Sequence, residues 1–533
     1  MPISQLASKS IAALVLTLPA VGLTGQSGAA GAYTDLYDFG ASYAYPTPYP
    51  LVMAEGPDDA LYGVTAAGGT QGKGTVFRVG SEGGLTTRHN FDGVHGSTPV
   101  GGLTLGPDGD LYGMAEHGGA HGYGEIFRIT PAGSFTVLYS FTGEADGGYP
   151  VSPLITGSDG ALYGTSYPGV AFRITKTGRF SVLTKIPTTS YGPLVQAYNG
   201  SLYGVTEFGG KYSAGTVYRI DGSVCTVLHS FDGPSGSYPV GGLVQGSDGN
   251  FYGTTTAGGT TNAGVIYEIT GQGTYKVLLS FDNRHPLGGY QSYAGLVEGG
   301  NGDLYGVTIW GGKTGDGVIF SVNLSGAYSV LYNFDSPVGT GAYATPVQDT
   351  NGFLYGMTNR GGGGKTGVIY RFADGSPAFV RLVSSNGVVG STVNIVGHGF
   401  SGATSVSFNG TPASFRVLSD TLLSAVVPSG ETGIVDVVTS QGQLFSFTIY
   451  RVAPQMTTFS PEDGQAGDTV TVRGKGLVQT SAIAVGGVRV TAYSVLSDSS
   501  ISFRVPQGAR TGQITLTTPG GSATSGATFT VDG

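Results

Sequence analysis

The stretch GGLTLGPDGDLYGMAEHGGAHGYGEIFRITPAGSFTVLYSF, from Gly101 to Phe141, decides the fold. It contains four short runs that are rich in β-branched and aromatic residues: GGLTLG, LYGMAE, EIFRIT and FTVLYSF. Gly, Pro and Asp residues separate these runs and favour turns between strands. The stretch therefore predicts one antiparallel sheet, whose strands we call a, b, c and d in chain order.

The same pattern recurs seven times along the chain. The b strand begins with the tripeptide LYG, or FYG in one copy, at Leu61, Leu111, Leu162, Leu202, Phe251, Leu304 and Leu354. An Asp-Gly or Asn-Gly pair precedes six of these seven copies, and such pairs favour two-residue hairpin turns. Seven four-stranded repeats predict a β-propeller with seven blades, and a β-solenoid is the alternative.

The two ends of the repeat region predict how the propeller closes. A copy of the d strand, TDLYDF from Thr34 to Phe39, stands before the first LYG tripeptide. After the last c strand, GVIYRF from Gly367 to Phe372, no comparable d strand follows. We therefore expect the N-terminal strand to complete the last blade, which would protect the strand edges there.

The last third of the chain has a different composition and contains two similar segments. The first begins VSSNGVVGSTVNIVGHGF at Val383, and the second begins FSPEDGQAGDTVTVRGKGL at Phe459. Each has an early G-x-T-V strand followed by G-x-G, and later a V-P-x-G motif. Short alternating strands at a spacing of about ten residues are typical of a β-sandwich.

Two family resemblances support this division. The unit LYGxTxxGGxxxxGxVFRI, best matched at Leu61–Val79, Leu111–Ile129 and Leu202–Ile220, resembles the glycine-rich Gloeobacter/Verrucomicrobia repeat of bacterial exported proteins. The third repeat departs from this unit because TSYPGVAFRI lacks the double glycine. The two C-terminal segments resemble IPT/TIG immunoglobulin-like sandwiches. We expect a signal peptide at 1–30, a propeller at 33–374 and two sandwiches at 375–451 and 453–533.

Composition and the N-terminal segment indicate an exported protein. The apolar run from Ile11 to Leu23 is followed by small residues, as in a cleaved secretory signal. No later apolar stretch reaches membrane-spanning length, so we expect no membrane span after cleavage. The net charge is −9 without a basic stripe, which disfavours nucleic acid as a partner. We expect a monomer that is secreted or held at the cell surface.

The connections between strands differ on the two propeller faces. The a–b and c–d turns are short, whereas the b–c and d–a connections are longer, and ligands usually bind to long loops on a rigid scaffold. The residues at the end of each b strand vary between repeats, and most of them precede a Gly-Gly pair. The candidate binding residues are Glu116, His117, Tyr167, Glu207, Phe208, Trp310, Asn359 and Arg360. Sequence drift between repeats is the alternative explanation of this variability.

The sequence favours a non-catalytic binding protein with a carbohydrate or protein ligand. The seven histidines and single cysteine form no ligand pattern, so we expect no metal, and no motif indicates a cofactor or catalytic residues. Two alternatives remain open. One is a polysaccharide hydrolase or lyase that uses carboxylates such as Glu116 and Glu207. The other is a structural component of an extracellular matrix.

Overall fold

The computed structural model describes residues 31–40, 52–58, 60–197, 200–337 and 339–532. The described chain is all-β, and its helical elements are two short 3-10 turns, η2 (Pro286–Gly288) and η3 (Phe400–Gly402). No helix in these ranges is long and apolar enough to span a bilayer. The expected signal peptide at 1–30 lies outside the described residues.

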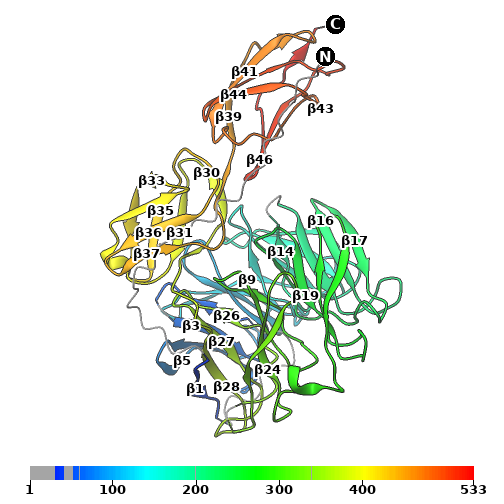
Figure 1. The fold of residues 1–533 in the computed structure, drawn as a ribbon, viewed down its shortest axis with the longest axis vertical. Coiled ribbons are helices and arrows are strands. Elements are labelled where there is room, and N and C mark those ends of the chain that lie inside the picture. The colour runs from blue at the N-terminus through cyan, green and yellow to red at the C-terminus, as the bar shows by residue number, and fades with distance from the viewer. Residues whose placement is uncertain (1–30, 41–51, 59, 198–199, 338, 533) are drawn as a thin grey trace, which may run out of the picture.

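Seven four-stranded antiparallel sheets form the propeller blades (Figure 1). Blades one to three are β2 (Ala54–Glu55), β3 (Ala60–Thr65), β4 (Thr75–Gly80), β5 (Gly83–Asn90); β6 (Ser97–Leu105), β7 (Leu111–His117), β8 (Glu125–Ile129), β9 (Phe135–Ser140); β10 (Ile155–Thr156), β11 (Leu162–Ser166), β12 (Val170–Ile174), β13 (Phe180–Lys185). Blades four and five are β14 (Val195–Gln196), β15 (Leu202–Thr206), β16 (Thr216–Asp221), β17 (Val224–Ser230); β18 (Leu243–Gln245), β19 (Phe251–Thr254), β20 (Val265–Ile269), β21 (Tyr275–Ser280). Blades six and seven are β22 (Val297–Glu298), β23 (Leu304–Val307), β24 (Val318–Val322), β25 (Tyr328–Asn333); β26 (Val347–Gln348), β27 (Phe353–Met357), β28 (Val368–Ala373), β1 (Tyr33–Asp38).

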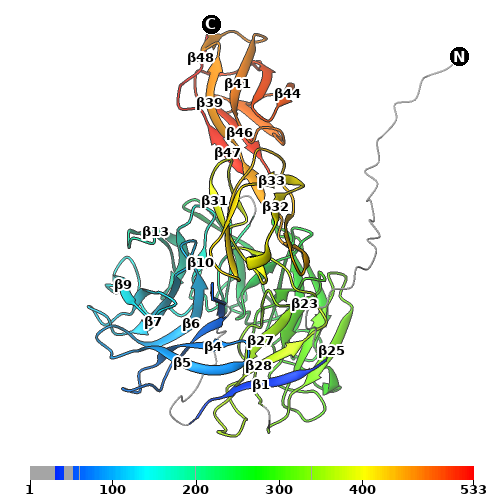
Figure 2. The same cartoon turned by 90° about the vertical axis from the view of Figure 1, so that its left-hand side faces the viewer.

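The N-terminal strand completes the seventh blade, as the sequence predicts. Strand β1 pairs antiparallel with β28, and Tyr33 lies opposite Phe372 (Figure 2). The ring of Tyr33 stacks on that of Tyr332 in the neighbouring blade with the centroids 4.2 Å apart. Aromatic stacking and edge pairing therefore both hold the strand in place.

The first and seventh blades are joined in the same way as other neighbouring blades. In four blades, the side chain at the end of strand a accepts a hydrogen bond from a backbone N–H in the a–b turn of the preceding blade. The donor and acceptor residues are Ser158 and Gln196, Ser247 and Glu298, Gly300 and Gln348, and Thr350 and Glu55. Since Glu55 belongs to the first blade and Thr350 to the seventh, the pattern continues across the junction.

The LYG tripeptide has a packing role in each blade and also a turn role in six of them. The glycine lies beneath an aromatic ring of strand c, so that a Cβ on Gly113 would collide with Phe127. In four blades the tyrosine hydroxyl donates a hydrogen bond to the turn aspartate, as Tyr112 does to Asp108 at 2.8 Å. In the sixth and seventh blades the direction is reversed, because the side chain of the turn asparagine donates to the hydroxyl, as Asn351 does to Tyr355 at 2.9 Å. These contacts explain why the tripeptide recurs, and they assign the turn carboxylates to structure.

Two β-sandwiches follow the propeller. The first contains the sheets β29 (Arg381–Leu382), β31 (Thr392–Val396), β35 (Leu422–Val426), β34 (Phe415–Val417) and β33 (Thr411–Ala413), β32 (Ser405–Phe408), β36 (Val435–Thr439), β37 (Gly442–Phe445), with the pair β30 (Asn386–Val388) and β38 (Arg451–Ala453). The second contains β39 (Gln455–Ser460), β41 (Thr469–Lys475), β45 (Ser500–Arg504), β44 (Tyr493–Ser497) and β43 (Val488–Arg489), β42 (Ala482–Val485), β46 (Ile514–Thr518), β47 (Gly521–Thr524), with the pair β40 (Asp463–Gly464) and β48 (Thr530–Val531). Each sandwich has its own hydrophobic core.

The first sandwich packs on the a–b turn face of the propeller. The side chain of Asn394 donates a hydrogen bond to the carbonyl of Pro107 at 2.8 Å, and that of Thr421 donates to the carbonyl of Pro57 at 2.6 Å. Both prolines lie in a–b turns. The second sandwich lies beyond the first, so the two form a column on one side of the propeller (Figure 2).

Candidate functional site

The face opposite the sandwiches carries the exposed aromatic side chains. We call the surface formed by the b–c and d–a connections the loop-rich face. Within the described part of the propeller, every exposed aromatic side chain lies on this face, and these are Tyr123, Tyr167, Phe208, Tyr212, Tyr238 and Trp310. Exposed apolar groups that gather on one face commonly mark an interaction surface.

Backbone bridges hold the variable residues at the ends of the b strands. The N–H of Tyr290 donates to the carbonyl of Trp310 at 2.9 Å, and the N–H of Trp310 donates back at 3.3 Å. Equivalent reciprocal pairs join Gly148 with Tyr167 and Thr340 with Arg360. Tyr167, Trp310 and Arg360 are therefore held by equivalent pairs of backbone hydrogen bonds, although their side chains differ.

The predicted residues Glu116 and His117 lie together near the boundary between the second and third blades. Oε1 of Glu116 lies 3.8 Å from Nδ1 of His117, and burial raises the pKa of Glu116. The ring of His117 makes a T-shaped contact with Tyr149, at 5.3 Å between centroids. Tyr149 also contacts Tyr123 at 5.5 Å between centroids, so three aromatic rings are in contact with one another, and one of them, His117, lies beside Glu116.

The predicted residues Glu207 and Phe208 form a similar group between the fourth and fifth blades. Phe208 makes a T-shaped contact with Tyr238, at 5.6 Å between centroids. Burial raises the pKa of Glu207. Burial raises the pKa of Tyr293, and Tyr343 and the charge of Glu207 add to this effect.

The remaining predicted residues lie elsewhere on the same face. Asn359 has a buried Oδ1 with no hydrogen-bond partner among the described residues. The charge of Arg360 opposes the burial that raises the pKa of Tyr343, and Tyr343 packs against Tyr293 with the ring centroids 5.2 Å apart. No described side-chain contact links Tyr167 or Trp310 to either glutamate group.

Sequence reasoning missed Tyr149 and Tyr238, which provide the second ring in each glutamate group. Both lie in d–a connections, which the sequence analysis assigned to the binding face, but the named candidate residues came only from the ends of the b strands. A signal was present, because GGYPV at 147–151 and GSYPV at 236–240 have a tyrosine where GSTPV at 96–100 has Thr98. The aromatic pairs need contact between neighbouring blades, which one repeat alone does not reveal.

Glu125 is an unusual buried carboxyl in the second blade. Two other blades have a hydroxyl pair at this position, Thr65 with Thr75 and Thr206 with Thr216, and in each pair the Oγ1 atoms lie 2.8 Å apart. The second blade instead has Ala115 and Glu125. Glu125 is buried, its Oε1 has no hydrogen-bond partner among the described residues, and burial raises its pKa to about 7.

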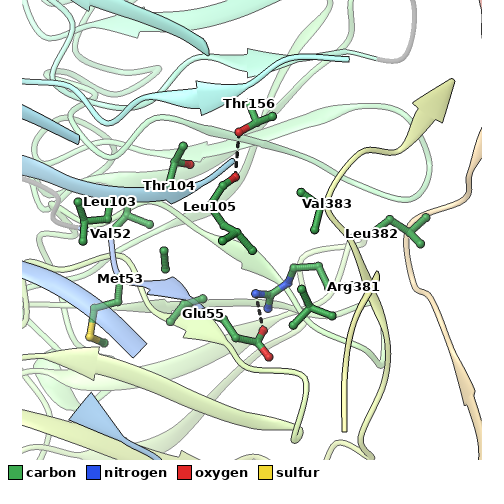
Figure 3. A pocket seen from close by; sticks show the side chains of 13 residues that line it. Val52, Met53, Glu55, Leu103, Thr104, Leu105, Thr156, Arg381, Leu382 and Val383 are labelled. Atoms are coloured by element: carbon green, nitrogen blue, oxygen red, sulfur yellow. Dashed lines mark hydrogen bonds and ion pairs between the residues drawn. The ribbon is translucent and has the colours of Figure 1, made fainter. Parts of the chain in front are cut away.

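A second polar cluster lies between the propeller and the first sandwich. One potential ligand atom from each of Glu55, Asp349 and His398 lies within 4.8 Å of the others. Arg381 of the sandwich forms an ion pair with Glu55 at 2.7 Å, beside a cavity of about 250 Å³ (Figure 3). The guanidinium group already occupies a Glu55 oxygen, so a divalent cation would have to displace it. We therefore assign this cluster to interdomain attachment.

These observations define a seven-bladed β-propeller followed by two immunoglobulin-like sandwiches. The Gloeobacter/Verrucomicrobia repeat model matches residues 26–176 and 189–411, so the chain belongs to this family. The IPT/TIG domain model matches residues 377–450 and 454–531. Both expected resemblances are confirmed. The gap at 177–188 falls in the third repeat, which departs from the common unit in sequence.

Solved structures show only distant similarity. The surface glycan-binding protein PbSGBP-B from Prevotella bryantii is 20% identical, with 28% of this chain and 41% of that chain covered and a TM-score of 0.22. A fungal alcohol oxidase of the AA5 family, solved with copper, is 13% identical, with 77% and 99% covered and a TM-score of 0.43. The chain thus spans less than half of the first protein, and TM-scores of this size assign neither ligand nor activity. No curated protein matches the chain.

Proposed function

We propose that this is an exported protein that binds a glycan on the loop-rich face of its propeller. The observation that carries the proposal is the placement of the exposed aromatic side chains, which all lie on that face within the described propeller. A flat aromatic ring offers an apolar surface to the C–H groups of a sugar.

Polar groups beside these rings supply the second requirement of a sugar site. Ligand sites combine apolar walls with a few polar groups that fix orientation. Glu116, Glu207 and Asn359 provide oxygen acceptors for sugar hydroxyls, and Arg360 provides donors. The described contacts of the first sandwich all go to the opposite face, which supports a role of the sandwiches as a spacer.

Affinity electrophoresis tests the proposal. The full-length protein is run in native gels that contain hydroxyethylcellulose, galactomannan or polygalacturonate. We expect at least one polysaccharide to retard the protein, and Phe208→Ala and Trp310→Ala to weaken the retardation. Val224→Ala is the matched control, because Val224 is 61% exposed but lies on the outer strand β17. Equal retardation of all three variants would reject the loop-rich face as the binding surface.

A polysaccharide hydrolase or lyase is the second candidate. Burial raises the pKa of Glu116 and of Glu207, which is the direction of shift that a general acid needs. This candidate predicts the release of reducing ends from a bound polysaccharide, and the loss of that activity in Glu116→Gln or Glu207→Gln. Activity that persists in both variants would remove these residues from catalysis.

A further inference from the structure

The two glutamate groups on the loop-rich face are equivalent positions in different repeats. Glu116 is the penultimate residue of β7 and Glu207 directly follows β15, and each is followed by an aromatic residue, His117 or Phe208. In each group that aromatic residue contacts a tyrosine from the next blade at nearly the same distance, 5.3 Å for His117 and 5.6 Å for Phe208. The same set of a glutamate, an aromatic residue and a tyrosine therefore occurs twice on the loop-rich face.

The two tyrosines share an unusual backbone conformation. Tyr149 has a φ of 46° and Tyr238 a φ of 58°, in the left-handed region that non-glycine residues seldom occupy. The N–H of Tyr149 donates to the carbonyl of Tyr123 at 2.7 Å, and that of Tyr238 donates to the carbonyl of Ala214 at 2.8 Å. The backbone of each tyrosine is thus fixed by a hydrogen bond to a residue of the preceding blade.

Two other blades have the same left-handed backbone position without the glutamate, aromatic residue and tyrosine. Thr98 and Gln291 occupy the same left-handed position, with φ values of 54° and 57°. Neither follows a blade with a Glu-aromatic pair, since the preceding b strands end in Ala66-Ala67 and Thr256-Ala257. The left-handed backbone position therefore does not require a tyrosine, nor a glutamate in the preceding blade. The two groups that have both residues need another explanation.

Each group offers a tyrosine ring and a carboxylate that accepts no hydrogen bond within the described part of the protein. Among the described residues, no side chain or backbone group donates a hydrogen bond to Glu116 or Glu207, although both are partly buried. A partly desolvated carboxylate favours a ligand with neighbouring hydroxyl donors and disfavours a ligand with a negative charge. A neutral sugar meets both conditions, and its apolar face fits the tyrosine ring.

We propose that these groups are two equivalent subsites that bind two separate sugars of one neutral polysaccharide chain. The Glu116–His117–Tyr149 group is the first subsite, and the Glu207–Phe208–Tyr238 group is the second. This inference rests on the proposed function and adds the ligand class and the valency. Binding at one subsite raises the effective concentration of the chain at the other, so the two act together on long chains.

Isothermal titration calorimetry of the full-length protein tests the valency. The probes are cellotriose and mannotriose, which are short, and hydroxyethylcellulose and galactomannan, which are long. The variants are Tyr149→Gln, Tyr238→Gln and the double variant. Glutamine is the matched replacement, because Gln291 adopts the same backbone conformation in a sister blade. Circular dichroism and thermal unfolding confirm that each variant is folded.

For a short probe, we expect two sites per wild-type protein, one per single variant and none in the double variant. For the matching long probe, we expect each single variant to bind at least about 100-fold more weakly than the wild type. A wild-type stoichiometry of one short probe, abolished by only one of the single variants, would overturn the two-site inference and leave the proposed function intact.

Two further outcomes separate the inference from the proposed function. Retardation by polygalacturonate, with none by the neutral polysaccharides, would overturn the neutral ligand class but support glycan binding. Failure of the wild-type protein to bind any of the polysaccharides would overturn both. In the first of these outcomes, the retardation of Phe208→Ala by polygalacturonate shows whether the loop-rich face is the binding surface.

Discussion

The rings of Phe208 and Tyr238 lie 5.6 Å apart in a T-shaped arrangement, although the two residues belong to different blades. Phe208 lies in the b–c connection of the fourth blade, after β15 ends at Thr206, and Tyr238 lies in the d–a connection that leads into the fifth blade. The contact therefore exists only because neighbouring repeats pack side by side. It shows how a repetitive fold can build a specific surface at the boundaries between its units.

The ion pair between Arg381 and Glu55 should hold the first sandwich on the propeller. Arg381→Met leaves the carboxylate of Glu55 buried without its cation, and we expect a loss of about 3 kcal/mol in the free energy of unfolding. The double variant Glu55→Gln/Arg381→Met should recover most of this loss, because glutamine serves at the equivalent position Gln348. Thermal unfolding measures both, and an unchanged Arg381→Met variant would contradict the assignment.

Glu125 should make the stability of the propeller depend on pH. Its pKa in the folded protein is about 7, above the ordinary value of 4.5, so the folded state binds the proton more tightly than the unfolded state. This stabilisation is fully present below pH 4.5 and is lost as the pH rises through 7. The full shift corresponds to about 3 kcal/mol.

The variant Ala115→Thr/Glu125→Thr tests this expectation by transferring the hydroxyl pair of Thr65 and Thr75 to the second blade. We expect its melting temperature to change less between pH 5 and pH 8 than that of the wild type, and to be higher at pH 8. A pH dependence equal to that of the wild type would show that Glu125 is not the titrating group.

The glycine of the LYG tripeptide should tolerate no side chain. In Gly113→Ala, the new Cβ would collide with the ring of Phe127 and the side chain of Leu103, and we expect a cost of about 2 kcal/mol. Gly526→Ala is the control, since nothing lies within 4 Å of a Cβ at that position. Chemical denaturation of the two variants measures the difference, and equal stabilities would refute the packing role.

The N-terminal strand should be required for a stable propeller. Removal of residues 33–39 exposes the edge of β28 and removes the stacking of Tyr33 on Tyr332. We expect the truncated protein to aggregate or to elute as larger species, because an unpaired edge strand favours association. Light scattering after size-exclusion chromatography measures this. A monomer with wild-type stability would show that β1 is dispensable.

Much of the fold could be predicted because the same pattern of four strands, with the LYG tripeptide, occurs seven times in the sequence. The spare strand before Leu61 was enough to predict the pairing of β1 with β28. The candidate site was only partly predictable. Glu116, Glu207 and Phe208 stand out as deviations within a repeat, whereas their partners Tyr149 and Tyr238 become visible only when blades pack together. Glu55 and Arg381 lie far apart in the chain, so local sequence patterns could not predict their ion pair.

The fluorescence of Trp310 tests the central claim, that the loop-rich face binds a glycan, most directly. Trp310 is the only tryptophan of the chain, and it is 43% exposed on that face. Acrylamide quenching is measured with and without hydroxyethylcellulose or galactomannan. We predict that a polysaccharide that retards the protein also lowers the quenching constant of Trp310. An unchanged constant at saturating polysaccharide, together with unchanged retardation of Phe208→Ala, would contradict the claim, because the glycan would then leave both exposed rings of this face uncovered.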